Sequence, residues 1–67
     1  MKAVRVDVEV PDGRTMVRPP RVGFQLLRGR ITETTSWFRL ELRGTARRIE
    51  QALAAFRERG LRVHPSP

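Results

Sequence analysis

The sequence predicts an α+β domain in which a mostly antiparallel sheet is covered on one face by one main helix. Three patterns support this fold class. Apolar and polar residues alternate strictly over residues 3–10, two further apolar-rich runs fall at 23–32 and 37–43, and residues 46–59 repeat apolar side chains at helical spacing. At 67 residues, the chain is expected to form a single domain over residues 1–67.

The first strand is predicted over residues 3–10, AVRVDVEV. Its valines occupy every second position and are expected on the buried face, with the charged residues between them on the solvated face. The tripeptide PDG at 11–13 predicts a turn. Two adjacent prolines in the segment 14–22 exclude a helix or a central strand there. This segment is therefore expected to be a hairpin return or an irregular crossover.

Two paired strands are predicted over residues 23–32 and 37–43, and both are expected in the centre of the sheet. In the first, the apolar parity changes between Leu26 and Leu27, which predicts either two partly covered faces or a bulge near Gly29. In the second, Phe38, Leu40 and Leu42 are expected to face the helix, and Trp37, Arg39, Glu41 and Arg43 to face away from it.

The main helix is predicted over residues 46–59, with Thr45 as the N-cap. Its apolar stripe consists of Ile49, Ala52, Leu53 and Phe56. Gly60 is expected just past the end of the helix, where glycine accepts a positive φ. Residues 61–63 can then form a short last strand, which Pro65 ends.

The composition limits the classes of function. With no cysteine and a single histidine, the sequence predicts no disulfide, metal site or cofactor. It also lacks tyrosine and a phosphate-binding glycine loop, so we expect no enzyme activity. No apolar run reaches the length of a membrane span, and no signal peptide is evident, which predicts a cytoplasmic protein without membrane insertion. Because so short a chain buries little core, homo-oligomerisation is expected.

The net charge of +7 allows two interpretations. Fourteen residues are Lys or Arg, and all of them except Lys2 are arginine. This excess can mark an anionic partner, or it can reflect base composition or a hot habitat.

An arginine-rich face around Trp37 is one candidate site. Strand parity places Trp37 with Arg39 and Arg43 on the face away from the helix, and Arg5 and Arg62 join them if the first and last strands belong to the same sheet. Such a face can form a subunit contact, pack at a sheet edge, or stack nucleic-acid bases. Cross-strand pairing with nearby carboxylates would reduce its charge.

The first turn of the helix is a second candidate. Thr45, Arg47 and Arg48 lie where the helix dipole favours an anion. The alternative is that both arginines extend into solvent and that Arg47 pairs with Glu50.

The run FQLLRGRITETTSWFRLELRG at 24–44, followed by ARRIEQALAAFRERGLRV at 46–63, resembles the NIL domain. The family is named for an Asn-Ile-Leu motif, and the tripeptide Gln25-Leu26-Leu27 stands at that position. The resemblance covers about residues 22–64. It implies a ferredoxin-like or ACT-like βαββαβ sandwich with a regulatory role. NIL domains occur at the C-terminus of methionine-importer ATPases, where they bind methionine, and beside iron–sulfur ferredoxin domains.

The resemblance implies an amino-acid ligand at a subunit interface and a separate partner protein of the transporter or ferredoxin type. The residues implied as ligand-binding are Gln25, Leu26, Leu27, Arg28, Gly29 and Arg30. Two departures stand out. The first family helix is expected to be shortened or absent, because only residues 11–22 are available for it, and Gln25 replaces the motif's Asn. A nucleic-acid-binding module is the alternative function.

Overall fold

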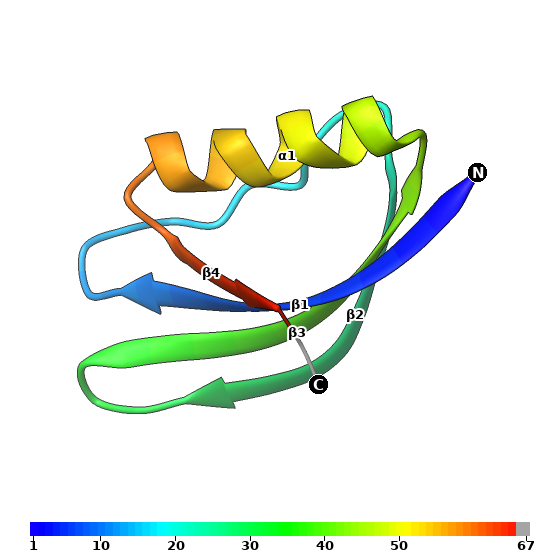
Figure 1. Ribbon diagram of the computed structural model, residues 1–67. Coiled ribbons are helices and arrows are strands. Elements are labelled where there is room, and N and C mark those ends of the chain that lie inside the picture. The colour runs from blue at the N-terminus through cyan, green and yellow to red at the C-terminus, as the bar shows by residue number, and fades with distance from the viewer. Residues whose placement is uncertain (66–67) are drawn as a thin grey trace.

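The computed structural model describes residues 1–65. In these residues the elements follow in the order β1 (Lys2–Pro11), β2 (Gly23–Ile31), β3 (Thr35–Gly44), α1 (Ala46–Glu58) and β4 (Arg62–Pro65). The strands form one antiparallel sheet, and α1 lies across one of its faces (Figure 1). The predicted α+β class and ferredoxin-like or ACT-like architecture are thus confirmed. No helix within residues 1–65 is long and apolar enough to cross a membrane.

The strand order in the sheet is β2-β3-β1-β4. β3 pairs antiparallel with both β1 and β2, so β1 and β2 run parallel with β3 between them. β3 is central as predicted, but the prediction that β2 is central is wrong. β2 is an edge strand because β1 occupies the second edge of β3.

The core lies between α1 and the inner face of β1 and β3. The valine alternation is confirmed, since Val6 and Val8 are buried opposite Leu40 and Phe38. The fully or nearly buried apolar residues are Val6, Val8, Val10, Leu40, Leu42, Ile49, Ala52, Phe56 and Leu61. Burial of each large side chain contributes about 1.5–3 kcal/mol to stability, so this cluster is the main stabilising element of the domain.

A β-bulge in β2 decides which way its side chains point. The register shifts between Leu26 and Arg28, so Leu27 is the extra residue, and the expected position near Gly29 is wrong by two residues. Before the bulge, Leu26 lies opposite the inward Leu40; after it, Arg28 lies opposite the outward Arg39. The extra residue therefore brings the arginine of β2 to the face away from the helix.

The crossover at residues 12–22 contains no helix or strand, which confirms the irregular crossover and the loss of the first family helix. It begins with a tight turn in which the Arg14 amide donates to the Pro11 carbonyl at 3.1 Å and Gly13 has a φ of +82°. The segment then runs along α1 (Figure 1). Met16 packs against the core and Pro19 is buried, so part of the missing helix's cover is supplied by this segment.

The caps of α1 match the sequence prediction, although the helix ends at Glu58, one residue earlier than expected. The Thr45 hydroxyl accepts a hydrogen bond from the Arg48 amide at 3.1 Å. At the other end, the Leu61 amide donates to the Phe56 carbonyl and Gly60 has a φ of +82°. This is a Schellman cap, and it turns the chain into β4. β4 continues through Pro65, where it was expected to stop.

Candidate ligand site on the open face of the sheet

The face of the sheet opposite α1 carries the outward side chains of the strands, and we call it the open face. All of the residues predicted there, Trp37, Arg39, Arg43, Arg5 and Arg62, lie on this face. Three of these arginines contact carboxylates. The Arg39–Asp7 pair lies at 2.9 Å, the Arg43–Glu41 pair at 3.5 Å and the Arg62–Glu9 pair at 3.8 Å. Much of the positive charge predicted for this face is therefore offset locally.

The Asp7–Arg39 pair is bidentate. Arg39 Nε donates to Asp7 Oδ1 at 2.9 Å, and a terminal guanidinium nitrogen donates to Oδ2 at 3.3 Å. This hydrogen bonding is the main cause that lowers the pKa of Asp7 below its ordinary value, with burial acting against it and the charges of Arg39 and His64 adding to it. The same hydrogen bonding raises the pKa of Arg39. Both carboxylate oxygens of Asp7 thus accept a hydrogen bond from Arg39.

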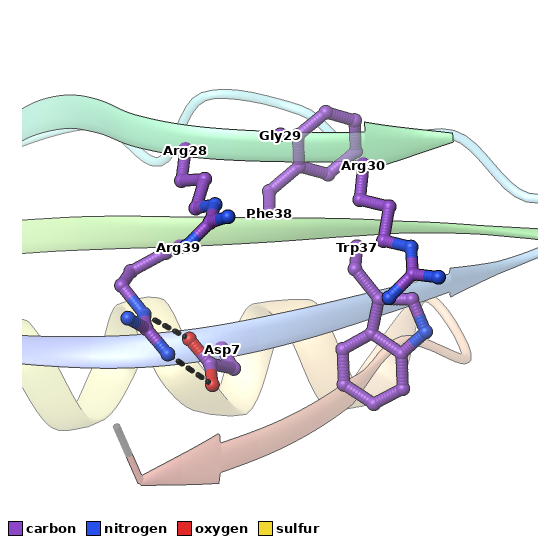
Figure 2. Close-up of a pocket in the computed structure, with 7 residues that line it drawn as sticks. All are labelled: Asp7, Arg28, Gly29, Arg30, Trp37, Phe38 and Arg39. Atoms are coloured by element: carbon purple, nitrogen blue, oxygen red, sulfur yellow. Dashed lines mark hydrogen bonds and ion pairs between the residues drawn. The ribbon is translucent and has the colours of Figure 1, made fainter. Parts of the chain in front are cut away.

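A shallow hollow of about 330 Å³ lies on the β2–β3 side of the open face. It is lined by Asp7, Arg28, Gly29, Arg30, Trp37, Phe38 and Arg39 (Figure 2). Arg28 lies directly opposite Arg39, and Arg30 directly opposite Trp37. Within residues 1–65, neither Arg28 nor Arg30 forms an ion pair. With three guanidinium groups and one carboxylate, the hollow carries a formal charge of +2.

Trp37 is half-buried at the end of the hollow. Its ring lies 5.6 Å from the His64 ring, centroid to centroid, with a 31° tilt between the planes. His64 belongs to β4, where it pairs with Asp7. Strand alternation predicted that Asp7 faces outward, but His64 was not expected to support Trp37, because the length of β4 was underestimated.

The six residues predicted as a ligand site do not share one surface. Arg28, Gly29 and Arg30 line the hollow, whereas Gln25 lies on the same face but opposite Glu41. Leu26 is on the helix side, opposite Leu40, and Leu27 is the bulge residue. What the six share is exposure and a place on the outermost strand of the sheet.

The predicted anion site at the start of α1 is not joined to the hollow. α1 covers the other face of the sheet (Figure 1). Thr45 is engaged in capping, and Arg47 and Arg48 are both exposed. Among the described residues, the expected pair between Arg47 and Glu50 does not form.

A comparison with known protein families matches residues 4–65 to the NIL domain. The match includes β1 as well as the part of the chain with the recognisable motif, and so covers nearly the whole sequence. Comparisons with curated proteins and with solved structures give no match. The chain belongs to the NIL domain family.

Proposed function

We propose that this NIL domain is a non-catalytic regulatory module that binds a small amino-acid ligand along β2, acts as a homo-oligomer, and controls a separate partner protein in the cytoplasm. NIL domains form a family of small regulatory or ligand-binding modules. The exposure of β2 is the main observation that supports this proposal. β2 is an edge strand, and seven consecutive residues from 25 to 31 are exposed on it.

An amino acid of the methionine type fits the chemistry along β2. The guanidinium of Arg28 offers two parallel donors to a carboxylate. Backbone carbonyl groups on the unpaired edge of an outer strand can accept hydrogen bonds from an ammonium group. Leu26 and Leu27 are 53% and 38% exposed and offer apolar contact to the ligand side chain.

A second copy of the chain suits the same edge. Antiparallel pairing of part of β2 with its symmetry mate would satisfy free backbone groups there and continue the sheet across the dimer, and the carbonyl groups beyond the paired part would remain for the ligand. Leu26 and Ile31, which is 78% exposed, lie next to that edge and would lose solvent contact. A small domain gains stability from such burial. The partner protein under control would be a transporter or a ferredoxin-type protein.

A thermal-shift series with the natural amino acids tests the ligand, and sedimentation velocity tests the oligomer. We expect methionine, or an amino acid with a similar side chain, to raise the melting temperature. Ligand at 100 times its Kd stabilises the folded state by about 2.7 kcal/mol. Leu27→Glu should remove both the shift and the dimer, because it places a charge on the β2 edge.

Ala54→Glu is the matched control, since Ala54 is exposed on α1. It adds the same charge away from β2 and should leave ligand binding and sedimentation unchanged. A chain that stays monomeric at all concentrations and responds to no amino acid would refute the proposal.

A nucleic-acid-binding module is the second candidate, favoured by Trp37 next to Arg28 and Arg30. The carboxylates on the same face weaken this candidate. Binding to phosphates would fall steeply with salt, and Trp37→Ala would reduce it if bases stack on the ring.

A further inference from the structure

We infer that the hollow on the open face is a second ligand site, which takes a compact phosphoryl dianion attached to an aromatic group, as in a mononucleotide. It shares Arg28 with the proposed amino-acid site, which otherwise uses the edge and the inner side of β2, and it differs from that site by using Arg30 and Trp37. Four properties of the hollow support this ligand: its charge, the pairing of Asp7 with Arg39, the distribution of charge around it, and the indole of Trp37 at one side.

The positive charge of the hollow favours an anionic ligand. Arg28 and Arg39 are direct cross-strand neighbours, and like charges at such positions destabilise a sheet. Asp7 offsets the charge of Arg39 but leaves Arg28 and Arg30 without a carboxylate partner among residues 1–65. A phosphate monoester carries about −1.5 to −2 charges at neutral pH. It therefore balances the formal +2 of the hollow and accepts the paired donors of arginine.

The pairing of Asp7 with Arg39 favours an anion over a zwitterion in this hollow. An α-amino acid brings an ammonium group that needs an acceptor. Among residues 1–65, Asp7 is the only carboxylate in the lining, and each of its oxygens accepts a hydrogen bond from Arg39, at 2.9 and 3.3 Å, so an ammonium group would have to share this acceptor with Arg39. An anion that has no ammonium group needs no such acceptor. The hollow is therefore expected to prefer an anion, and the amino-acid site a zwitterion.

The distribution of charge favours a compact ligand over a long polyanion. The two unpaired arginines of the hollow are both on β2, at one side of the open face; Arg5, which also forms no ion pair within residues 1–65, lies on β1 outside the hollow. Beyond the hollow, the carboxylates of Glu9 and Glu41 lie on β1 and β3, where a nucleic-acid backbone crossing the sheet would meet them. The volume of about 330 Å³ is near the lower end of the range for small-molecule sites, about 300–1,000 Å³.

Trp37 supplies the aromatic wall. It stands opposite Arg30, which extends from β2 in the same hollow (Figure 2). The His64 ring of β4 lies 5.6 Å from the indole, centroid to centroid. A base bound beside the phosphate can stack on the half-buried indole.

The intrinsic fluorescence of Trp37 can be used to measure ligand binding in the hollow. Trp37 is the single tryptophan of a chain without tyrosine, so intrinsic fluorescence reports directly on the hollow. The full chain is titrated with AMP, inorganic phosphate, adenosine and an eight-residue oligothymidylate. We expect saturable fluorescence changes with AMP and with phosphate, and tighter binding of AMP by about tenfold, as base stacking on an aromatic side chain contributes. Adenosine should give no saturable change.

Arg28→Gln and Arg30→Gln should each weaken AMP binding about tenfold or more, because each removes a charge-assisted hydrogen bond. Arg43→Gln is the matched control. It removes the same charge from β3 on the same face but outside the hollow, and its effect should stay below about twofold, as for a partly screened surface charge. Circular dichroism checks that each variant is folded.

Three results would overturn the inference. One is equal weakening by Arg43→Gln and Arg30→Gln, which would mean diffuse attraction to the basic surface. Another is adenosine binding as tightly as AMP. The third is oligothymidylate binding more tightly than AMP with a steep salt dependence, which would assign the face to nucleic acid. The amino-acid proposal is judged separately, through Leu27→Glu and the dimer, so either can fail alone.

Discussion

Asp7 and Arg39 join the two central strands through their side chains as well as through the backbone. Their side chains are 24% and 37% exposed, so solvent screens the pair and its contribution to stability is modest. Its larger effect is on the hollow. Because Asp7 forms its ion pair with Arg39, its single negative charge leaves the hollow with a formal charge of +2, from Arg28 and Arg30. The pair thus leaves those two arginines available to an anion.

At the same scale, the pair makes stability depend on acid. The folded-state pKa of Asp7 is depressed below the unfolded value of about 3.9. Its stabilising contribution is therefore complete above that pH and is lost as the pH falls through the folded pKa. We expect Asp7→Asn to lose less stability than the natural chain between pH 7 and pH 3 in urea unfolding. Arg39→Gln breaks the same pair and should reduce the acid dependence similarly; an unchanged dependence in both variants would contradict the assignment.

Among the elements, β2 owes the orientation of its side chains to one extra residue. The bulge at Leu27 separates an inner-facing leucine from outer-facing arginines. The parity change in the sequence predicted the irregularity but not its position, because two adjacent leucines and a nearby glycine are all compatible with a bulge. The family resemblance implied one ligand site over residues 25–30, whereas the structure distributes those residues over two faces.

The C-terminal cap of α1 allows an element-scale prediction. Gly60 has a φ of +82°, which costs an L-residue about 1–2 kcal/mol. A Cβ atom there would also lie 2.9 Å from Arg14 Nε, although that flexible side chain can move. We expect Gly60→Ala to lower the free energy of unfolding by about 1–2 kcal/mol in chemical denaturation. Gly60→Asn should lower the free energy of unfolding by less than Gly60→Ala does, because asparagine tolerates a positive φ better than alanine. Equal losses would point to crowding instead of backbone strain.

At the scale of the whole fold, the one helix and four strands of residues 1–65 provide a single small core. The strand alternation, the helix caps and the apolar stripe of α1 could all be predicted, because each follows from local spacing in the sequence. The edge position of β2 and the pairing of His64 with Asp7 could not, since they depend on which strands meet in space. The hollow belongs to this second group: its residues come from β1, β2 and β3.

Because the core is small, the stability of the domain should depend strongly on Phe56, its largest side chain. Phe56 is 1% exposed, and Phe56→Ala should cost about 3–5 kcal/mol through lost burial and a residual cavity. Small domains have total stabilities of about 5–15 kcal/mol, so the variant should melt at a much lower temperature in calorimetry. The neighbouring Arg57 is exposed, and Arg57→Ala should change stability by less than about 0.5 kcal/mol.

The strand order also has a consequence for how the chain folds. β2 and β3 are the only sheet neighbours among residues 1–65 that follow each other directly in the sequence, and Thr32 closes their turn through hydrogen bonds with Thr35. β1 and β4 must close much longer loops to reach their partners, which costs more entropy and slows their pairing. We expect the β2–β3 hairpin to form in the folding nucleus. Most of the anion-binding hollow would then acquire its register before the hydrophobic core is complete.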